Sequence, residues 1–194
     1  MNAGKDFLML LNNPSRWETI WTRAEIEAIN ASFDENIKSV KMDLPTCRRN
    51  LSDLKDSFDA RCLPFFLLFG TLLGAHRDKD FIPGDHDTDI GILAASASLL
   101  MVALNEWKVI RIWDTLITIM RGGEYIDIYI FEDSPDPEKW WSCENYYLEK
   151  KYLNPLGSIE FWGQRYWTVN DIESYLTDRY GADWRTPANV QASK

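Results

Sequence analysis

Hydrophobic residues in the first third of the chain recur at the spacing of an α-helix, with charged residues between them. One apolar stripe begins after Arg23 and consists of Ile26, Ile29, Phe33 and Ile37. A second begins after Pro45 and consists of Leu51, Leu54 and Phe58. Because residues three and four apart share one face of a helix, the pattern predicts two helices that cover a sheet.

The middle of the chain changes to short apolar runs that are typical of strands. Leu63–Phe69 is continuous and ends at Gly70, which predicts a buried strand, and Thr71–His76 is predicted to begin a helix. Runs rich in β-branched residues predict further strands over 87–93, 108–113, 115–121 and 124–131, with a helix over 94–107. The fold class is therefore α/β (α+β), a mixed sheet flanked by helices.

The last third is rich in aromatic residues and follows a polar, proline-bearing loop over 133–138. One more helix is predicted near its end. Asn170 is expected to cap that helix, with Glu173 three residues later as in a capping box. Gly181 stands where the residue after a helix C-terminus belongs.

Length and composition favour one globular domain. The chain has 194 residues, of which 45% are hydrophobic and 26% charged. We expect a single domain over 1–194, with a helical flank (1–62), a catalytic core (63–131) and a C-terminal extension (132–194).

The net charge of −9 argues against nucleic acid as a partner, because phosphate binding needs clustered basic residues. A nucleotide substrate remains compatible, since a divalent cation can bring positive charge to an acidic site.

Cysteine usage and hydropathy predict a cytoplasmic location. The three cysteines form no CxxC pair, which is typical of a reducing compartment. The apolar run Phe7–Leu11 is shorter than a secretory signal requires, and Cys62–Ala75 is shorter than a membrane-spanning helix. No transmembrane segment is therefore expected, and the oligomeric state stays open.

Three aspartates at alternate positions, Asp85, Asp87 and Asp89, stand directly before the apolar residues 90–92. Side chains alternate between the two faces of a strand. Asp87 and Asp89 are therefore predicted to share one face while the isoleucines enter the core. Asp85 is close enough along the chain to lean toward the same place.

Asp127 repeats this pattern as a lone carboxylate within the apolar strand 125–130. If the two strands are neighbours, Asp127 lies beside Asp87 and Asp89, and the repulsion among the carboxylates calls for a hard divalent cation such as Mg²⁺. Two plainer interpretations are a solvated acidic turn and an ion-pair role for Asp127. An EF-hand loop counted from Asp85 is excluded, because its sixth and twelfth positions hold Ile90 and Ser96.

Gly70 and Thr71 are candidates for phosphate binding, because a strand that feeds a helix there leaves free backbone N–H groups at the helix N-terminus. The alternative is that the glycine only permits a tight turn. Arg77 and Lys79 either bind phosphate or are surface charges. His86 is a further candidate for a general base.

Three motifs, in order, resemble the LicD family, which includes bacterial phosphocholine transferases and is related to fukutin-type phosphoribitol transferases. The first is the segment 67–92, which contains Gly-Thr-Leu-Leu-Gly-Ala, Phe-Ile-Pro and Asp-x-Asp-x-Asp. The second is the strand 125–129, and the third is Tyr-Gly-x-Asp-Trp at 180–184. The chain departs from many relatives at Gly84, where they have Trp, and at His86, where they have an acid.

The resemblance implies a nucleotidyltransferase fold. It also implies metal-dependent transfer of a phosphorylated alcohol, phosphocholine-like or phosphoribitol-like, from a CDP-activated donor to a glycan or glycolipid hydroxyl in polysaccharide biosynthesis. By this resemblance Asp87 and Asp89 are ligands of Mg²⁺ or Mn²⁺, and Asp85 is a third or supporting ligand. Asp127 is a ligand or the base, and Gly70 and Thr71 bind phosphate.

Two other functions compete with this interpretation. A nucleotidyltransferase that moves NMP from an NTP to a small molecule or protein would use the same Gly-Thr and Asp-x-Asp elements. The other alternative is a non-catalytic module that binds nucleotide or glycan. The presence of all four aspartates argues against it. If the donor carries choline, Trp140 and Trp141 are candidates for an aromatic cage, because they are expected in a loop.

Overall fold

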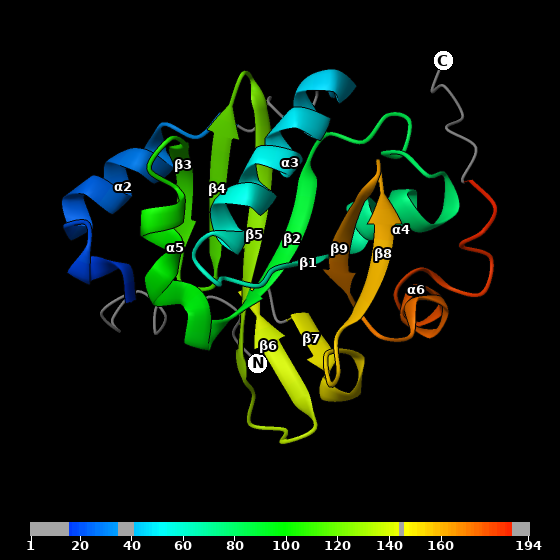
Figure 1. Cartoon of the computed structure of the whole chain (residues 1–194). Helices are drawn as coiled ribbons and strands as arrows, with labels where there is room; N and C mark the ends of the chain where they lie inside the picture. Colours follow the sequence, from blue (N-terminus) through cyan, green and yellow to red (C-terminus); the bar gives the residue numbers. More distant parts are fainter. Residues whose placement is uncertain (1–15, 35–40, 144–145, 188–194) are drawn as a thin grey trace, which may run out of the picture.

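Seven strands form one mixed sheet in the order β3-β4-β5-β2-β1-β9-β8, and two further strands extend it from β5 (Figure 1). The structure is a computed structural model that describes residues 16–34, 41–143 and 146–187. The strands are β1 (Phe66–Leu67), β2 (Thr88–Leu93), β3 (Lys108–Trp113), β4 (Leu116–Arg121), β5 (Glu124–Asp133), β6 (Lys139–Ser142), β7 (Tyr146–Glu149), β8 (Gly157–Phe161) and β9 (Gln164–Thr168). The α-helices are α2 (Arg23–Ala31), α3 (Leu44–Asp59), α4 (Phe69–Arg77), α5 (Ala97–Ala103) and α6 (Ile172–Tyr180), and short 3₁₀ turns cover Arg16–Thr19, Ala94–Ser96 and Lys150–Tyr152.

Strand pairing makes the sheet mixed, as the sequence predicts. Strands β2 and β5 run parallel, as do β1 and β9. The pairs β1–β2, β3–β4, β4–β5 and β8–β9 are antiparallel. The parallel contact between β2 and β5 places the two acidic segments side by side.

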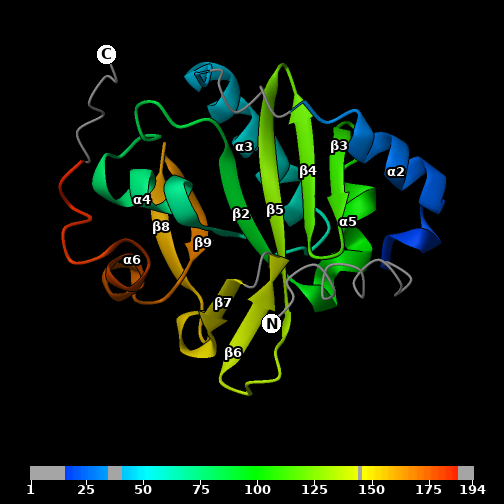
Figure 2. The same ribbon diagram turned by 180° about the vertical axis from the view of Figure 1, so that it is seen from behind.

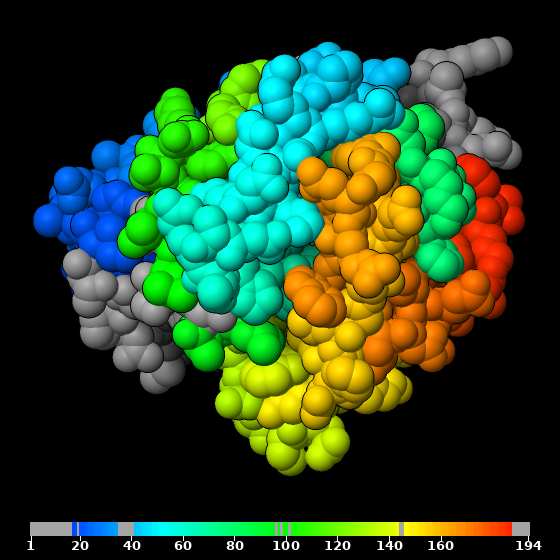
Figure 3. Space-filling model, viewed as in Figure 1, coloured from blue at the N-terminus to red at the C-terminus, as the bar shows by residue number. Residues whose placement is uncertain are grey.

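Helices α3 and α5 cover one face of the β2–β5 part of the sheet, and α3 crosses the middle of that face (Figures 1 and 3). The isoleucines of β5, which point to this face, are almost fully buried, at 0–1% exposure for Ile126, Ile128 and Ile130. Seen from behind, β5 and β2 lie in front of α3 (Figure 2). The alternate residues of β5, including Asp127, therefore face away from the two helices.

The predicted helices and strands of the first two thirds are largely confirmed. The stripe after Pro45 is α3, whose N-cap Asp43 accepts a hydrogen bond from the Thr46 N–H at 3.1 Å. The stripe after Arg23 is α2 for Ile26 and Ile29, but the helix ends at Ala31, so Phe33 lies beyond it. Ile37 and the segment Phe7–Leu11 lie outside the described residues. The predicted strand over 63–69 is only two residues long, because α4 already begins at Phe69.

The C-terminal third contains strands that the sequence analysis does not predict. Strands β8 and β9 form a hairpin, and β6 and β7 form another. Trp140 and Trp141 lie on β6, so the expectation that they occupy a loop is wrong. The N-cap of α6 is Asp171, which accepts from the Ser174 N–H at 3.1 Å. The prediction of Asn170 in that place is wrong, because its side chain donates to the Lys151 carbonyl at 2.6 Å.

Among the described residues, no helix combines the length and the apolar character that crossing a bilayer requires.

Candidate active site

Carboxylates from the adjacent strands β2 and β5 gather on the face opposite α3. Asp89 and Asp127 are direct partners in the parallel register of the two strands. One carboxylate oxygen from each of Asp87, Asp89 and Asp127 lies within 4.8 Å of the others. Asp89 and Asp127 are only 6% and 4% exposed. The structure thus brings together the three aspartates that the alternation pattern selects.

Asp85 lies next to this triad, against Gly70 of helix α4. A Cβ atom at Gly70 would come within 2.5 Å of the Asp85 Oδ2 atom, so the missing side chain leaves room for this carboxylate. The other oxygen, Oδ1, accepts a hydrogen bond from the His86 backbone N–H at 3.1 Å. The position of the Asp85 carboxylate therefore depends on the glycine at position 70.

The start of helix α4 also contacts Asp89. The Gly70 backbone N–H donates a hydrogen bond to the Asp89 carboxylate. The buried Thr71 hydroxyl accepts a hydrogen bond from the Asp89 backbone N–H at 2.8 Å. In this structure the two residues predicted to bind phosphate hold the acidic strand, and the N-terminal end of the helix stabilises the negative charge beside it.

Asp127 forms a buried ion pair with Arg111, a residue that the sequence analysis does not select. The Arg111 guanidinium donates from Nη2 to both carboxylate oxygens, at 3.0 and 2.8 Å. Thr118, between them in the sheet, donates its hydroxyl to Asp127 and accepts from Arg111 Nε at 2.8 Å. Asp127 thus has the ion-pair role of the plainer interpretation and is also a member of the triad.

The clustering perturbs the acidity of the carboxylates. Burial, followed by the charges of Asp127 and Asp85, raises the pKa of Asp87 to about 6. Burial, followed by the charge of Asp87, raises the pKa of Asp89 well above its usual range. Burial raises the pKa of Asp85 as well. Each shift has the sign expected for carboxylates that lack enough compensating positive charge.

These carboxylates line an open pocket of about 1190 Å³, which is large enough for a nucleotide-sized ligand. Asp85, Asp87 and Asp89 form one part of the wall. Aromatic residues and Arg179 of helix α6 form another part, and the aromatic members are Phe69, Tyr129, Tyr146 and Tyr180. Arg179, like Arg111, is a basic residue that the sequence analysis does not select.

The two basic residues predicted to bind phosphate are placed differently. Arg77 lines the pocket, but its guanidinium donates two 2.8 Å hydrogen bonds to Asp78 and one of 3.1 Å to the Trp184 carbonyl. Lys79 is exposed, lies outside the pocket wall and donates to the His76 carbonyl at 2.9 Å. A phosphate would have to compete with these contacts at either residue.

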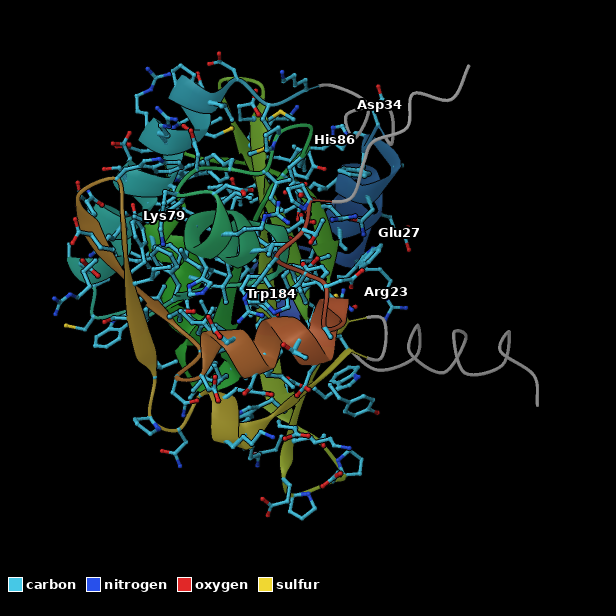
Figure 4. All side chains as sticks on the ribbon, turned by 90° about the vertical axis from the view of Figure 1, so that its right-hand side faces the viewer. Arg23, Glu27, Asp34, Lys79, His86 and Trp184 are labelled. Carbon is cyan, nitrogen blue, oxygen red and sulfur yellow. The ribbon has the colours of Figure 1, made fainter. Side chains whose placement is uncertain are left out.

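The C-terminal motif holds helix α6, which carries part of the pocket wall. Trp184 is 5% exposed, lies beside α6 and donates from its indole N–H to Thr177 of that helix at 3.1 Å (Figure 4). Tyr175 and Leu176 of α6 are buried in the core. The motif therefore fixes the helix that carries Arg179 and Tyr180 to the pocket wall.

The donor atoms fit a hard divalent cation. Three carboxylates converge within 4.8 Å, and the cationic group that contacts them among the described residues is Arg111, at Asp127. Mg²⁺ and Mn²⁺ take oxygen ligands of this kind, and a cation would remove the repulsion that raises the pKa values of Asp87 and Asp89.

The fold is that of nucleotidyltransferases. The solution structure of the antibiotic-resistance factor ANT(2″)-Ia matches with a TM-score of 0.52 at 15% identity, over 72% of this chain and 76% of that protein. The crystal structure of ANT(2″)-Ia in complex with adenylyl-2″-tobramycin matches with a TM-score of 0.50 at 16% identity, over 73% and 79% of the two chains. At such identities the likeness concerns the fold alone.

The chain belongs to the LicD/FKTN/FKRP family, whose nucleotidyltransferase domain matches residues 63–171, more than half of the sequence. The resemblance identified from the three motifs is therefore confirmed. A curated relative, the uncharacterized protein RT0683 of Rickettsia typhi, is 29% identical over 125 residues, which are 58% of this chain and 40% of the relative. The chain thus spans about two fifths of that relative's length.

Proposed function

We propose that this protein is a metal-dependent phosphotransferase. It moves a phosphorylated alcohol, phosphocholine-like or phosphoribitol-like, from a CDP-activated donor to a hydroxyl of a glycan or glycolipid. The observation that carries the proposal is the convergence of Asp87, Asp89 and Asp127, of which Asp87 and Asp89 lie on the wall of a nucleotide-sized pocket. Family membership supports the choice of transferase chemistry.

Asp87 and Asp89, with Asp127 as the third ligand, would hold Mg²⁺ or Mn²⁺. The ion supplies Lewis-acid charge to the donor's diphosphate when it is bound. The chain itself contributes positioning and a preorganised electrostatic environment, which dominate catalysis of phosphoryl-type transfer. Helix α4 orients Asp89 through Gly70 and Thr71, and Tyr125 reaches Asp87 with its hydroxyl at 3.5 Å.

Two carboxylates compete for the role of general base, Asp127 and Asp85. A carboxylate offers about four lone-pair positions, and Arg111 and Thr118 take up three of those on Asp127. Taking up a proton there would also break the ion pair. The geometry therefore favours Asp127 as a ligand, and Asp85, which lines the pocket outside the triad, as the group that accepts the proton of the acceptor hydroxyl.

The test measures product release with different donors. Purified protein with Mg²⁺ or Mn²⁺ is incubated with CDP-choline, CDP-ribitol, CTP or ATP and a glycan acceptor, and CMP and pyrophosphate are quantified. Release of CMP from a CDP-alcohol supports the proposal. Release of pyrophosphate from an NTP would show a nucleotidyltransferase instead, and nucleotide binding without turnover would show a binding module.

Matched variants connect the activity to the site. Asp87→Asn and Asp89→Asn should each lower turnover by at least about a thousandfold, as expected when a ligand to the catalytic ion is lost. Asp56→Asn, on the exposed face of α3, is the control and should leave turnover unchanged. Metal-dependent turnover near the wild-type rate in either ligand variant would refute the assignment.

A further inference from the structure

Arg179 of helix α6 lines the pocket and rests on aromatic rings. Its guanidinium carbon lies 4.8 Å from the ring centre of Phe69, 5.3 Å from that of Tyr146 and 5.8 Å from that of Tyr180. Phe69 in turn packs edge-on against Tyr129, with ring centres 4.9 Å apart, and Tyr129 also lines the pocket. A guanidinium held over ring faces keeps its hydrogen-bonding edges free for other partners.

Arg179 differs from the other arginines near the pocket in having no polar partner within the part of the chain that the structure describes. Across residues 16–34, 41–143 and 146–187, no carboxylate forms an ion pair with it and no hydrogen bond to its guanidinium is present. Arg77 is held by Asp78, and Arg185 pairs with Glu173. Of the described arginines on the pocket wall, Arg179 is therefore the one whose guanidinium is available to a ligand.

The charge balance of the pocket indicates what this ligand is. Four carboxylates surround the site, and Arg111 and one divalent cation together offset about three of their charges. A diphosphate would add further negative charge on the same side. The Arg179 guanidinium, which lines the same pocket, would reduce this repulsion and supply directed N–H donors to phosphate oxygens.

We propose that Arg179 binds a phosphate group of the substrate, and this inference rests on the function proposed above. The rings of Phe69 and Tyr146 form an aromatic recess beside Arg179. This recess is not a cage for a quaternary ammonium group, because the guanidinium already covers the faces of both rings. A second cation there would meet like charge. The head group of the donor consequently lies elsewhere, and the loss of Arg179 affects choline and ribitol donors equally.

The experiment compares phosphate binding by the whole chain and by matched variants. Binding of CDP, CDP-choline, CDP-ribitol, pyrophosphate and cytidine is measured by calorimetry in Mg²⁺ for wild type, Arg179→Gln, Arg179→Lys and Arg165→Gln. Arg165 is exposed on β9 and lies outside the pocket wall, so its variant is the control. Melting curves verify that each variant is folded.

Arg179→Gln should weaken binding of CDP and pyrophosphate at least about tenfold, the usual cost of one charge-assisted hydrogen bond. Binding of cytidine, which has no phosphate, should not change. Arg179→Lys should recover part of the loss, because lysine keeps the charge without the planar fork. The KM values for donor and for acceptor are measured separately for each variant. The substrate whose KM rises in Arg179→Gln is the one that carries the phosphate bound by Arg179.

Unchanged binding of CDP and pyrophosphate by Arg179→Gln would overturn the inference, whatever the reaction proves to be. Weakened binding of pyrophosphate together with NTP turnover would support Arg179 as a phosphate ligand and refute the CDP-alcohol donor. Equal binding losses for CDP-choline and CDP-ribitol support the inference. A loss confined to CDP-choline would contradict it, since that result would place the ammonium group at the recess.

Discussion

Arg111 and Asp127 lie two strands apart in one straight row across the sheet and form an ion pair, in which Arg111 Nη2 contacts both carboxylate oxygens, the nearer at 2.8 Å. The strand registers pair Arg111 with Thr118, Thr118 with Asp127, and Asp127 with Asp89. Both members of the ion pair are about 5% exposed. The positive charge beside Asp127 thus comes from β3, which ends the strand order and lies two strands from β5.

Removing Arg111 alone should destabilise the protein more than removing the pair. Arg111→Met leaves Asp127 buried beside two other carboxylates without its partner, and the free energy of unfolding should fall by about 3–5 kcal/mol. Asp127→Asn combined with Arg111→Met should recover part of that loss. Urea unfolding of both single variants and the double variant, without divalent cation, measures the coupling. Additive losses would show that the ion pair has no energetic role.

The acidic strands could be predicted from sequence because alternation alone assigns their faces. Thr88, Ile90 and Ile92 lie on one side of β2 and Asp87 and Asp89 on the other, so the alternation identifies the carboxylates before any tertiary contact is known. That Asp127 joins them required the strands to be neighbours, which the parallel pairing of β2 with β5 provides.

Arg111 and Arg179 could not be assigned in the same way, because their roles depend on tertiary neighbours. Arg111 interrupts the apolar run of β3, and this lone charge in a buried strand was the available signal. Its partner could be named only after the order β3-β4-β5 was known. Arg179 precedes the Tyr-Gly-x-Asp-Trp motif, but its aromatic contacts come from the distant elements α4 and β7.

The metal-free protein should lose stability as the pH rises through the range in which Asp87 ionises. Burial and neighbouring carboxylates raise its folded-state pKa to about 6, above the unfolded value of about 4. The folded state therefore binds more protons than the unfolded state in this interval, and the free energy of unfolding falls as the pH increases. The raised pKa of Asp89 contributes in the same direction.

Thermal melts in EDTA between pH 4.5 and 8 measure this dependence, and the expected decrease from Asp87 is about 1–3 kcal/mol. A saturating concentration of Mg²⁺ should reverse the slope, because the ion binds the deprotonated carboxylates and stabilises the folded state by mass action. Asp87→Asn should flatten the metal-free slope, and Asp56→Asn should not. Identical slopes with and without Mg²⁺ would contradict a cation site at these residues.

Two glycines one turn apart in α4 should respond differently to replacement by alanine. At Gly70 the added Cβ would meet the Asp85 Oδ2 atom at 2.5 Å, and that atom is the end of a movable side chain. At Gly74 it would meet the Asp80 backbone carbonyl oxygen at 2.5 Å and the Ile82 nitrogen at 3.0 Å, neither of which can rotate away. Gly70→Ala should therefore keep the melting temperature within a few degrees while lowering turnover at least about tenfold, because Asp85 leaves its position. Gly74→Ala should lower the free energy of unfolding by about 1–3 kcal/mol. Turnover of Gly70→Ala is then compared with that of Asp85→Ala. Similar losses indicate that the glycine acts through Asp85. Full activity in Gly70→Ala would show that the position of the Asp85 carboxylate has no part in the reaction.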